Sequence, residues 1–454
     1  MEILIFGLHW KNLPPMDPAL IKGIQLLLSL SILVVLHELG HFIPAKLFKT
    51  RVEKFYLFFD VNFALFKKKI GETEYGIGWL PLGGYVKISG MIDESMDTEQ
   101  MKQAPQPWEF RSKPAWQRLI IMLGGVTVNI ILGFLIYMMI LFVWGKEVLP
   151  TEAVPNGLNA APIAQTIGFQ NGDQILTVDG EPMEYVLDIN RHLFLRSPNS
   201  IEVLHADGQR EVLNIPEDFG STMFESGDMF PLTPRGTIFV DSLYPGNPVE
   251  IAGIEVGDQL ISYDGNTINS LDDLKSEELR SKDSIVFSVL RRDRALEFTV
   301  VPTENAVLGF IVKPELNIAT THVDLGLGQS ITEGFDFGYW TLHDYVVQFK
   351  YIFTKKGATQ VGGFAAIGSL FPAQWDWKGF WSSTALISII LAFMNILPIP
   401  ALDGGHVMFL LYEMISGRKP NDKFMEYAQM FGFFLLIALV LFANGNDVYR
   451  WLFT

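Results

Sequence analysis

The sequence predicts a multi-pass α-helical membrane protein with four transmembrane helices, a membrane-associated β-hairpin or small sheet, and a water-soluble block of two β-rich modules. Three observations predict this fold. Four segments are long and apolar enough to span a bilayer. One stretch of the chain carries the whole net charge, and the same stretch contains an internal repeat.

The composition limits the class of protein and its chemistry. The chain has 454 residues, of which 49% are hydrophobic, and a net charge of -16. Residues 146–315 hold 28 acidic and 12 basic residues, which accounts for all 16 negative charges. An acidic block in a neutral membrane frame gives no indication of nucleic-acid binding, which needs a basic face. The chain has no cysteine, so histidine and carboxylate side chains must hold any metal.

The first span lies within residues 1–48 and contains His37-Glu38-Leu39-Gly40-His41. Residues four apart share one face of a helix, so both imidazoles can reach one metal ion. Glu38 lies beside them as a general base for a metal-bound water. Because polar groups at bilayer depth are costly, this cluster indicates hydrolysis within the membrane. The alternative is a polar helix end that reaches the membrane interface.

The positive-inside rule orients the spans. Twelve Lys and Arg residues lie between Lys46 and Arg118, which predicts that this stretch is cytoplasmic and the acidic block is on the other side. His37 then lies about 15 residues, or about 22 Å, into the first span. A motif late in the third span reaches a similar depth.

Residues 395–406, Asn-Ile-Leu-Pro-Ile-Pro-Ala-Leu-Asp-Gly-Gly-His, form such a motif. The prolines predict a broken helix, which is tolerated at membrane depth only beside a cavity or within protein. Asp403 is an intramembrane carboxylate and therefore the expected third ligand. His406 is a weaker candidate, as an outer hydrogen-bond donor or a water-facing residue. The alternative is a kinked helix end at the interface.

Residues 75–88, in the loop before the second span, are rich in glycine and aromatic residues and partly alternate. They predict a short β-hairpin near the metal, whose edge could pair with an unwound substrate. An ordinary cytoplasmic hairpin is the alternative. After the acidic block, Phe335 to Phe353 predicts an amphipathic helix on the outer surface, with His343 as an interfacial residue.

The internal repeat has a spacing of 85 residues. Residues 168–180 align with 253–265, and six of the thirteen positions are identical. The shared pattern is a Gly-Asp turn, an apolar strand and an Asp-Gly hairpin turn. Two small β-rich modules are predicted.

These observations predict nine segments along the chain. They are an N-terminus with the first span (1–48), a cytoplasmic loop with the β element (49–113), the second span (114–145), the first module (146–232), the second module (233–305), a linker with the surface helix (306–379), the third span (380–416), a cytoplasmic loop (417–426), and the fourth span with the C-terminus (427–454).

In this order, His37 to His41, the Pro-Leu-Gly-Gly-Tyr-Val-Lys stretch at 81–87, the paired repeats and the motif at 395–405 resemble the site-2 protease family. The resemblance implies a zinc intramembrane endopeptidase of the bacterial inner membrane, in contact with lipid. Its expected substrates are single-span proteins, such as anti-sigma factors already cut outside by a site-1 protease, and remnant signal peptides. The repeats are expected to be extracytoplasmic PDZ-like domains that exclude untrimmed substrates.

The same resemblance implies roles for individual residues. His37, His41 and Asp403 match the zinc ligands, and Glu38 matches the catalytic base. The residues expected to hold substrate are Asn395, Pro398 and Pro400 in the third span, and Gly76, Gly78, Gly83, Gly84 and Tyr85 in the β element. The match is loose at residues 362–368, which leaves the surface-helix region less defined.

Two other functions make different demands on the sequence. A metal-ion transporter needs polar residues deep in several spans, and the second and fourth spans offer little beyond Asn129 and Gln429. A scaffold with a degenerate site predicts that the purified protein holds no zinc.

Overall fold

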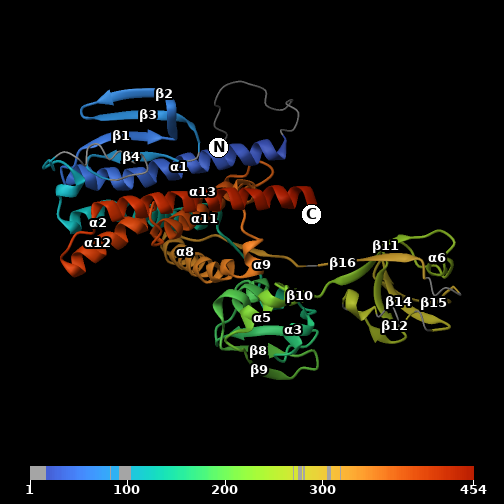
Figure 1. The fold of residues 1–454 in the computed structure, drawn as a ribbon. Coiled ribbons are helices and arrows are strands. Elements are labelled where there is room, and N and C mark those ends of the chain that lie inside the picture. Colours follow the sequence, from blue (N-terminus) through green and yellow to red (C-terminus); the bar gives the residue numbers. More distant parts are fainter. Residues whose placement is uncertain are drawn as a thin grey trace. The chain divides into compact units, whose positions relative to one another are not determined.

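The computed structural model describes residues 17–81, 83–91, 104–268, 270–274, 279, 282–303, 308–316 and 318–453. The chain divides into two compact units. One combines Met1–Gly145 with Asp324–Thr454, and the other is Lys146–Val323. The predicted functional residues all lie in the first unit, whose helices and small sheet are shown in Figure 1.

Among the described residues of the first unit, four helices are long and apolar enough to cross a membrane, as the sequence predicts. They are α1 (Pro18–Leu47), α2 (Ala115–Trp144), α11 (Trp377–Ile396) and α13 (Asp422–Phe453). Asp17 begins α1 by accepting a hydrogen bond from the backbone N–H of Ala19, with a proline at the first helical position. Many of the large apolar side chains of these helices are exposed, as expected for surfaces that face lipid.

The third span is interrupted where the prolines predict. α11 ends at Ile396, with Leu397 as its C-cap residue. A second helix, α12 (Asp403–Ser416), begins six residues after Leu397. The intervening turn contains Pro398 and Pro400, which cannot donate backbone hydrogen bonds. As a result, Asp403 is the first residue of a helix and not a residue inside one.

A four-stranded sheet follows α1 in sequence and lies beside it (Figure 1), with strand order β2-β3-β1-β4. Its strands are β1 (Val52–Leu57), β2 (Phe59–Ile70), β3 (Thr73–Leu80) and β4 (Tyr85–Ile88). The predicted hairpin within residues 75–88 is therefore wrong. β1 lies between β3 and β4, pairing with β3 in parallel and with β4 antiparallel, so the two strands do not pair with each other. The hydrophobic alternation that predicts strands cannot show which strands are neighbours.

The predicted amphipathic helix is present but begins earlier, as α8 (Leu327–Phe349). It packs on α2 through Phe335 and Phe134, whose ring centroids are 5.1 Å apart, and on α11 through Tyr345 and Phe393, at 5.5 Å. Two short helices follow, α9 (Lys355–Ala358) and α10 (Phe364–Ser369). Asp447 of α13 accepts hydrogen bonds from three backbone N–H groups at the start of α10, which holds α10 against the bundle.

The second unit contains two β-rich modules. The first has the antiparallel sheet β7-β8-β9, the pair β6 and β10, and three short helices: β6 (Leu158–Ala160), α3 (Pro162–Gln165), β7 (Gln174–Val178), α4 (Ile189–Arg191), β8 (Ser200–Leu204), β9 (Arg210–Asn214), α5 (Phe219–Ser226) and β10 (Leu232–Pro234). The pair β5 (Lys146–Val148) and β17 (Thr321–Val323) joins the two ends of the unit.

The second module is a sheet with strand order β15-β14-β12-β11-β16, with β13 paired to β12. Its elements are β11 (Thr237–Leu243), α6 (Pro248–Ile251), β12 (Gln259–Tyr263), β13 (Asn266–Thr267), β14 (Ile285–Arg291), β15 (Arg294–Val300) and β16 (Phe310–Glu315). The aligned segments of the internal repeat share an unusual backbone conformation. Asp179 and Asp264 both have positive φ, at 51° and 46°, and each is followed by a glycine with positive φ.

Candidate metal centre

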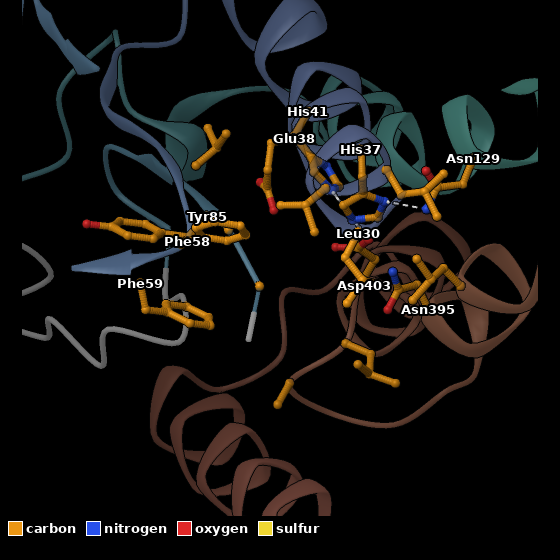
Figure 2. Close-up of a pocket in the computed structure, with 18 of the residues that line it drawn as sticks. Leu30, His37, Glu38, His41, Phe58, Phe59, Tyr85, Asn129, Asn395 and Asp403 are labelled. Atoms are coloured by element: carbon orange, nitrogen blue, oxygen red, sulfur yellow. Dashed lines mark hydrogen bonds and ion pairs between the residues drawn. The ribbon is translucent and has the colours of Figure 1, made fainter. Parts of the chain in front are cut away.

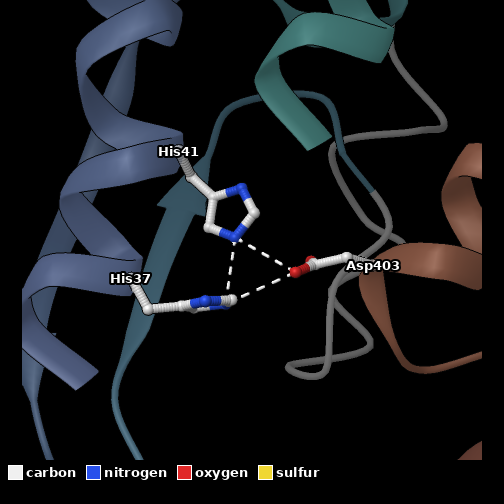
Figure 3. A group of neighbouring side chains, drawn as sticks. All are labelled: His37, His41 and Asp403. Carbon is white, nitrogen blue, oxygen red and sulfur yellow. Dashed lines mark hydrogen bonds and ion pairs between the residues drawn. The ribbon is translucent and has the colours of Figure 1, made fainter. Parts of the chain in front are cut away.

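Three side chains from two distant parts of the chain meet at one point. His37 and His41 project from α1, and Asp403 projects from the first turn of α12 (Figure 3). The Nε2 atoms of the histidines are 3.3 Å apart, and Asp403 Oδ2 lies 3.3 Å from the first and 3.4 Å from the second. All three side chains are buried or nearly so, with at most 15% exposed. In the described part of the chain, this is the group of three whose ligand atoms converge closely enough for a metal.

A hydrogen bond on the opposite edge of the His41 ring determines which ring nitrogen faces the other two ligand residues. His41 Nδ1 lies 2.8 Å from the carbonyl oxygen of Ile121 on α2, to which it donates a hydrogen bond. The proton is therefore on Nδ1, and the lone pair of Nε2 faces the other two residues. His37 has its Nδ1 3.1 Å from the amide of Asn129. Both rings thus present Nε2 to the centre.

This arrangement fits a zinc ion. Ligand atoms about 2.0–2.1 Å from a tetrahedral zinc are about 3.3–3.4 Å from one another, as the three atoms are here. Converging lone pairs and a carboxylate repel each other unless a cation lies between them. Asp403 Oδ2 is also buried without a hydrogen-bond partner, which is costly unless it binds a metal. Two histidines and a carboxylate leave a fourth position for water or substrate.

Glycines of α2 make room for the histidine rings. A Cβ on Gly125 would overlap both imidazoles, and Gly124 lies directly against the backbone of Gly40. Sequence reasoning missed these glycines, as well as the functions of Ile121 and Asn129. The pattern of residues 121, 125 and 129, spaced four apart in an apolar span, could have indicated that one face of α2 meets the motif.

Glu38 lies next to the three converging atoms and points into the adjoining cavity (Figure 2). Val86 of β4 lines the same cavity. The sheet approaches α1 closely at the site, because a Cβ on Gly84 would overlap the Val34 side chain of α1 and would lie 3.5 Å from Glu38 Cγ. The residue type and position suit a general base.

The loop that leads to Asp403 has an unusual backbone conformation. Ala401 has a φ of 80°, which is rare for a residue other than glycine. Its N–H donates a 3.2 Å hydrogen bond to Oε1 of Gln429, a buried side chain on α13. The fourth helix therefore stabilises the turn from which Asp403 projects.

The centre opens into a mainly apolar cavity of about 680 Å³. Of the residues predicted from the sequence, those that line it are His37, Glu38, His41, Gly83, Gly84, Tyr85, Asn395, Asp403 and His406. The structure does not bring Gly76, Gly78, Pro398 or Pro400 to its wall. Gly76 and Gly78 instead lie against the Tyr56 ring and the Phe59 backbone, where a side chain would not fit.

Comparison with known proteins agrees with a metal centre at these residues. A model of peptidase family M50 matches residues 25–439, which include both histidines and Asp403. The chain belongs to peptidase family M50. This is the family of site-2 proteases, so the resemblance in the sequence is confirmed.

Relatives match the chain over nearly its full length. The regulator of sigma E protease of Haemophilus influenzae is 27% identical over 93% of this chain and 98% of its own length. Protease RseP of Yersinia pestis is 26% identical over 93% of this chain and 97% of its own. A Neisseria meningitidis protein provisionally named a zinc metalloprotease is 27% identical, with 93% and 97% covered. The M50 chain is thus a zinc metalloendopeptidase with four helices suited to a membrane.

Proposed function

We propose that this M50 chain binds zinc through His37, His41 and Asp403 and cleaves peptide bonds of single-span membrane proteins within the bilayer, with Glu38 as the general base. The convergence of three ligand atoms beside Glu38, in an apolar cavity between membrane helices, carries this proposal. Zinc in such a site supplies a Lewis acid that polarises the scissile carbonyl and activates water for attack.

The protein residues then carry the proton. Glu38 takes one proton from the attacking water and delivers it to the nitrogen of the leaving amine, so that the carboxylate is restored when the peptide bond breaks. Glu38 lines the cavity together with His37 and His41. The apolar lining excludes bulk water from the reacting groups.

The substrate must be extended where it is cut, because a helical peptide bond is shielded and already hydrogen-bonded. β4 is an edge strand of its sheet, pairs there with β1, and lines the cavity through Tyr85, Val86 and Lys87. An unwound substrate segment added beside β4 would pass next to Glu38. Asn395 lines the same cavity and is positioned to contact that segment.

The remaining parts follow from the resemblance to site-2 proteases. The loop with the sheet faces the cytoplasm, and the two modules of Lys146–Val323 are PDZ-like domains on the outer side of a bacterial inner membrane. There they exclude proteins that a site-1 protease has not yet trimmed. Anti-sigma factors and remnant signal peptides are the substrate classes. Matching positive-φ turns in the two modules support their common origin.

Reconstitution into liposomes tests this function. The purified full-length chain should hold about one zinc per molecule and cleave a single-span reporter that has a short outer tail. Glu38→Gln should keep the zinc and lose cleavage, because the amide cannot accept the proton. Full cleavage by Glu38→Gln would refute the assignment of the base. Zinc uptake by sealed liposomes without cleavage would favour a transporter, and absence of bound zinc would favour a scaffold.

A further inference from the structure

We propose that Asn129 is a positioning residue for His37: its side-chain oxygen accepts the hydrogen bond from His37 Nδ1–H and thereby keeps Nε2 available to the metal. This inference rests on the proposed zinc site at His37, His41 and Asp403. It assigns a function to the second span, whose side chains do not enter the ligand set.

The hydrogen-bonding groups around Asn129 support this assignment. Its side chain is completely buried, and its amide lies 3.1 Å from His37 Nδ1. A neutral histidine that binds metal through Nε2 carries its proton on Nδ1, and that proton needs an acceptor. The amide oxygen of Asn129 is otherwise buried without a partner. Rotation of the amide by 180° exchanges its oxygen and nitrogen. The oxygen then faces His37 Nδ1, so the Nδ1 proton gains an acceptor and the oxygen gains a partner.

The position of Asn129 on α2 matches the spacing of the two ligands on α1. Ile121, Gly125 and Asn129 follow one another at intervals of four along one face of α2. The Ile121 carbonyl holds His41, Gly125 leaves space for both rings, and Asn129 holds His37. Each histidine ligand therefore has one acceptor behind it, and both acceptors come from α2.

A second contact fixes the backbone at Asn129. Ser388 of α11 donates a 2.7 Å hydrogen bond from its hydroxyl to the Asn129 carbonyl oxygen, and both residues are completely buried. Nearby, Gly133 of α2 lies against the Ile389 side chain, so the two helices are in close contact. α2 is therefore held to the helix that leads to Asp403, and the amide is held in place relative to the ligands.

The alternative is that Asn129 only stabilises the packing of α2 against its neighbouring helices. Variants of similar size distinguish this packing role from the positioning of His37. Asn129→Leu has a similar size and no acceptor. Asn129→Asp keeps an oxygen in the same position and recreates the carboxylate–histidine–zinc arrangement common in metal sites. A purely structural residue would tolerate leucine, which packs well among membrane helices, better than a buried aspartate.

The test is zinc affinity of the purified full-length chain, measured by competition with a chelator and metal analysis. Asn129→Leu should bind zinc about 10–100-fold more weakly than the wild type, and Asn129→Asp should stay within about threefold. The visible spectrum of the cobalt-substituted protein should change in the leucine variant and not in Ile131→Leu, at an exposed side chain of the same helix. Thermal unfolding of the metal-free proteins shows whether each variant is folded, and Asn129→Ala replaces the leucine variant if it is not.

The outcomes are distinct. Wild-type affinity in Asn129→Leu, or equal weakening in the leucine and aspartate variants, would overturn the proposal while leaving the metal site intact. His37→Ala is the control for the site itself. If His37→Ala leaves the zinc content unchanged, the proposed function and this inference are both wrong.

Discussion

Gly40 on α1 and Gly124 on α2 lie directly against each other, and a Cβ on either would overlap the other's carbonyl group. Their contact brings the helix with the histidines close enough to α2 for the Ile121 carbonyl to reach His41, at 2.8 Å. Small residues are typical where membrane helices approach so closely. The geometry of the metal centre therefore depends on residues that cannot bind metal.

Gly125→Ala should abolish zinc binding and cleavage while the helices remain formed. The added methyl group overlaps both imidazole rings, so at least one must turn away from the centre. Metal analysis and circular dichroism of the purified variant check this. The matched control is Gly23→Ala on α1, where the new Cβ has no neighbour within 4 Å; it should keep full activity and zinc. Equal zinc in the two variants would contradict the prediction.

Gln429→Leu should weaken zinc binding without touching a ligand. The substitution leaves the N–H of Ala401 buried and unpaired, at a cost of about 1–3 kcal/mol, in a residue already held at positive φ. The turn that carries Asp403 should then move. Zinc competition and thermal unfolding measure the effect. Phe431→Leu, at a side chain 67% exposed on the same helix, is the control and should change neither quantity.

Arg118 and Glu413 form a largely buried ion pair between α2 and α12, with 2.5 Å between Nη2 and Oε1. Arg118→Met should lower the free energy of unfolding by about 3–5 kcal/mol, because it leaves a buried carboxylate unpaired. The double variant with Glu413→Met should recover much of this loss. Thermal unfolding in detergent gives the comparison. The control is Arg191→Met, which removes an exposed ion pair with Asp188 and should lower the free energy of unfolding by less than about 1 kcal/mol. An equal loss in Arg118→Met and Arg191→Met would contradict the prediction that burial makes the first pair more important.

The first β-rich module should lose stability as pH rises. Hydrogen bonds with Asp173 and Glu211, at 2.7 and 3.0 Å, raise the pKa of His205 above its ordinary value. A raised pKa means that protonated His205 stabilises the folded state below the ordinary histidine pKa. This contribution disappears as the pH rises through the raised value, since a neutral ring can donate only one hydrogen bond.

Hydrogen exchange of the full-length chain tests this prediction. Protection of β8 and β9, corrected for intrinsic exchange, should fall from about pH 6 upward. The second module is an internal control, because Arg291 binds the corresponding Asp258 there and stays charged throughout. The same pH dependence in β14 and β15 would show that His205 is not responsible.

Local pattern was sufficient for much of the site. The spacing of His37 and His41, the hydrophobic length of the spans and the proline break before Asp403 are properties of single segments, so sequence periodicity reveals them. In the described residues, four helices have the length and composition of membrane spans, the helix break is present, and the family is confirmed. The roles of the individual ligands and of the PDZ-like modules remain predictions.

The order of strands in the sheet could not be predicted from local sequence pattern. Residues 75–88 were predicted to form a hairpin, yet β3 and β4 each pair with β1. Alternation shows that a segment is a strand, but neighbours in a sheet are chosen by side-chain packing and by the path of the connecting chain. Gly76 and Gly78 lie against the Tyr56 ring and the Phe59 backbone and do not line the cavity, which their sequence positions could not show.

By itself, the sequence determined that this protein has membrane helices carrying two histidines, a glutamate and a later aspartate at comparable depth. Only the tertiary structure decided that Gly125, Asn129 and Gln429 support them, because these functions depend on which helix faces meet. A ligand reveals itself by residue type and spacing. A supporting residue is recognisable only once its partner lies beside it, since glycine, asparagine and glutamine have no single function in a membrane helix.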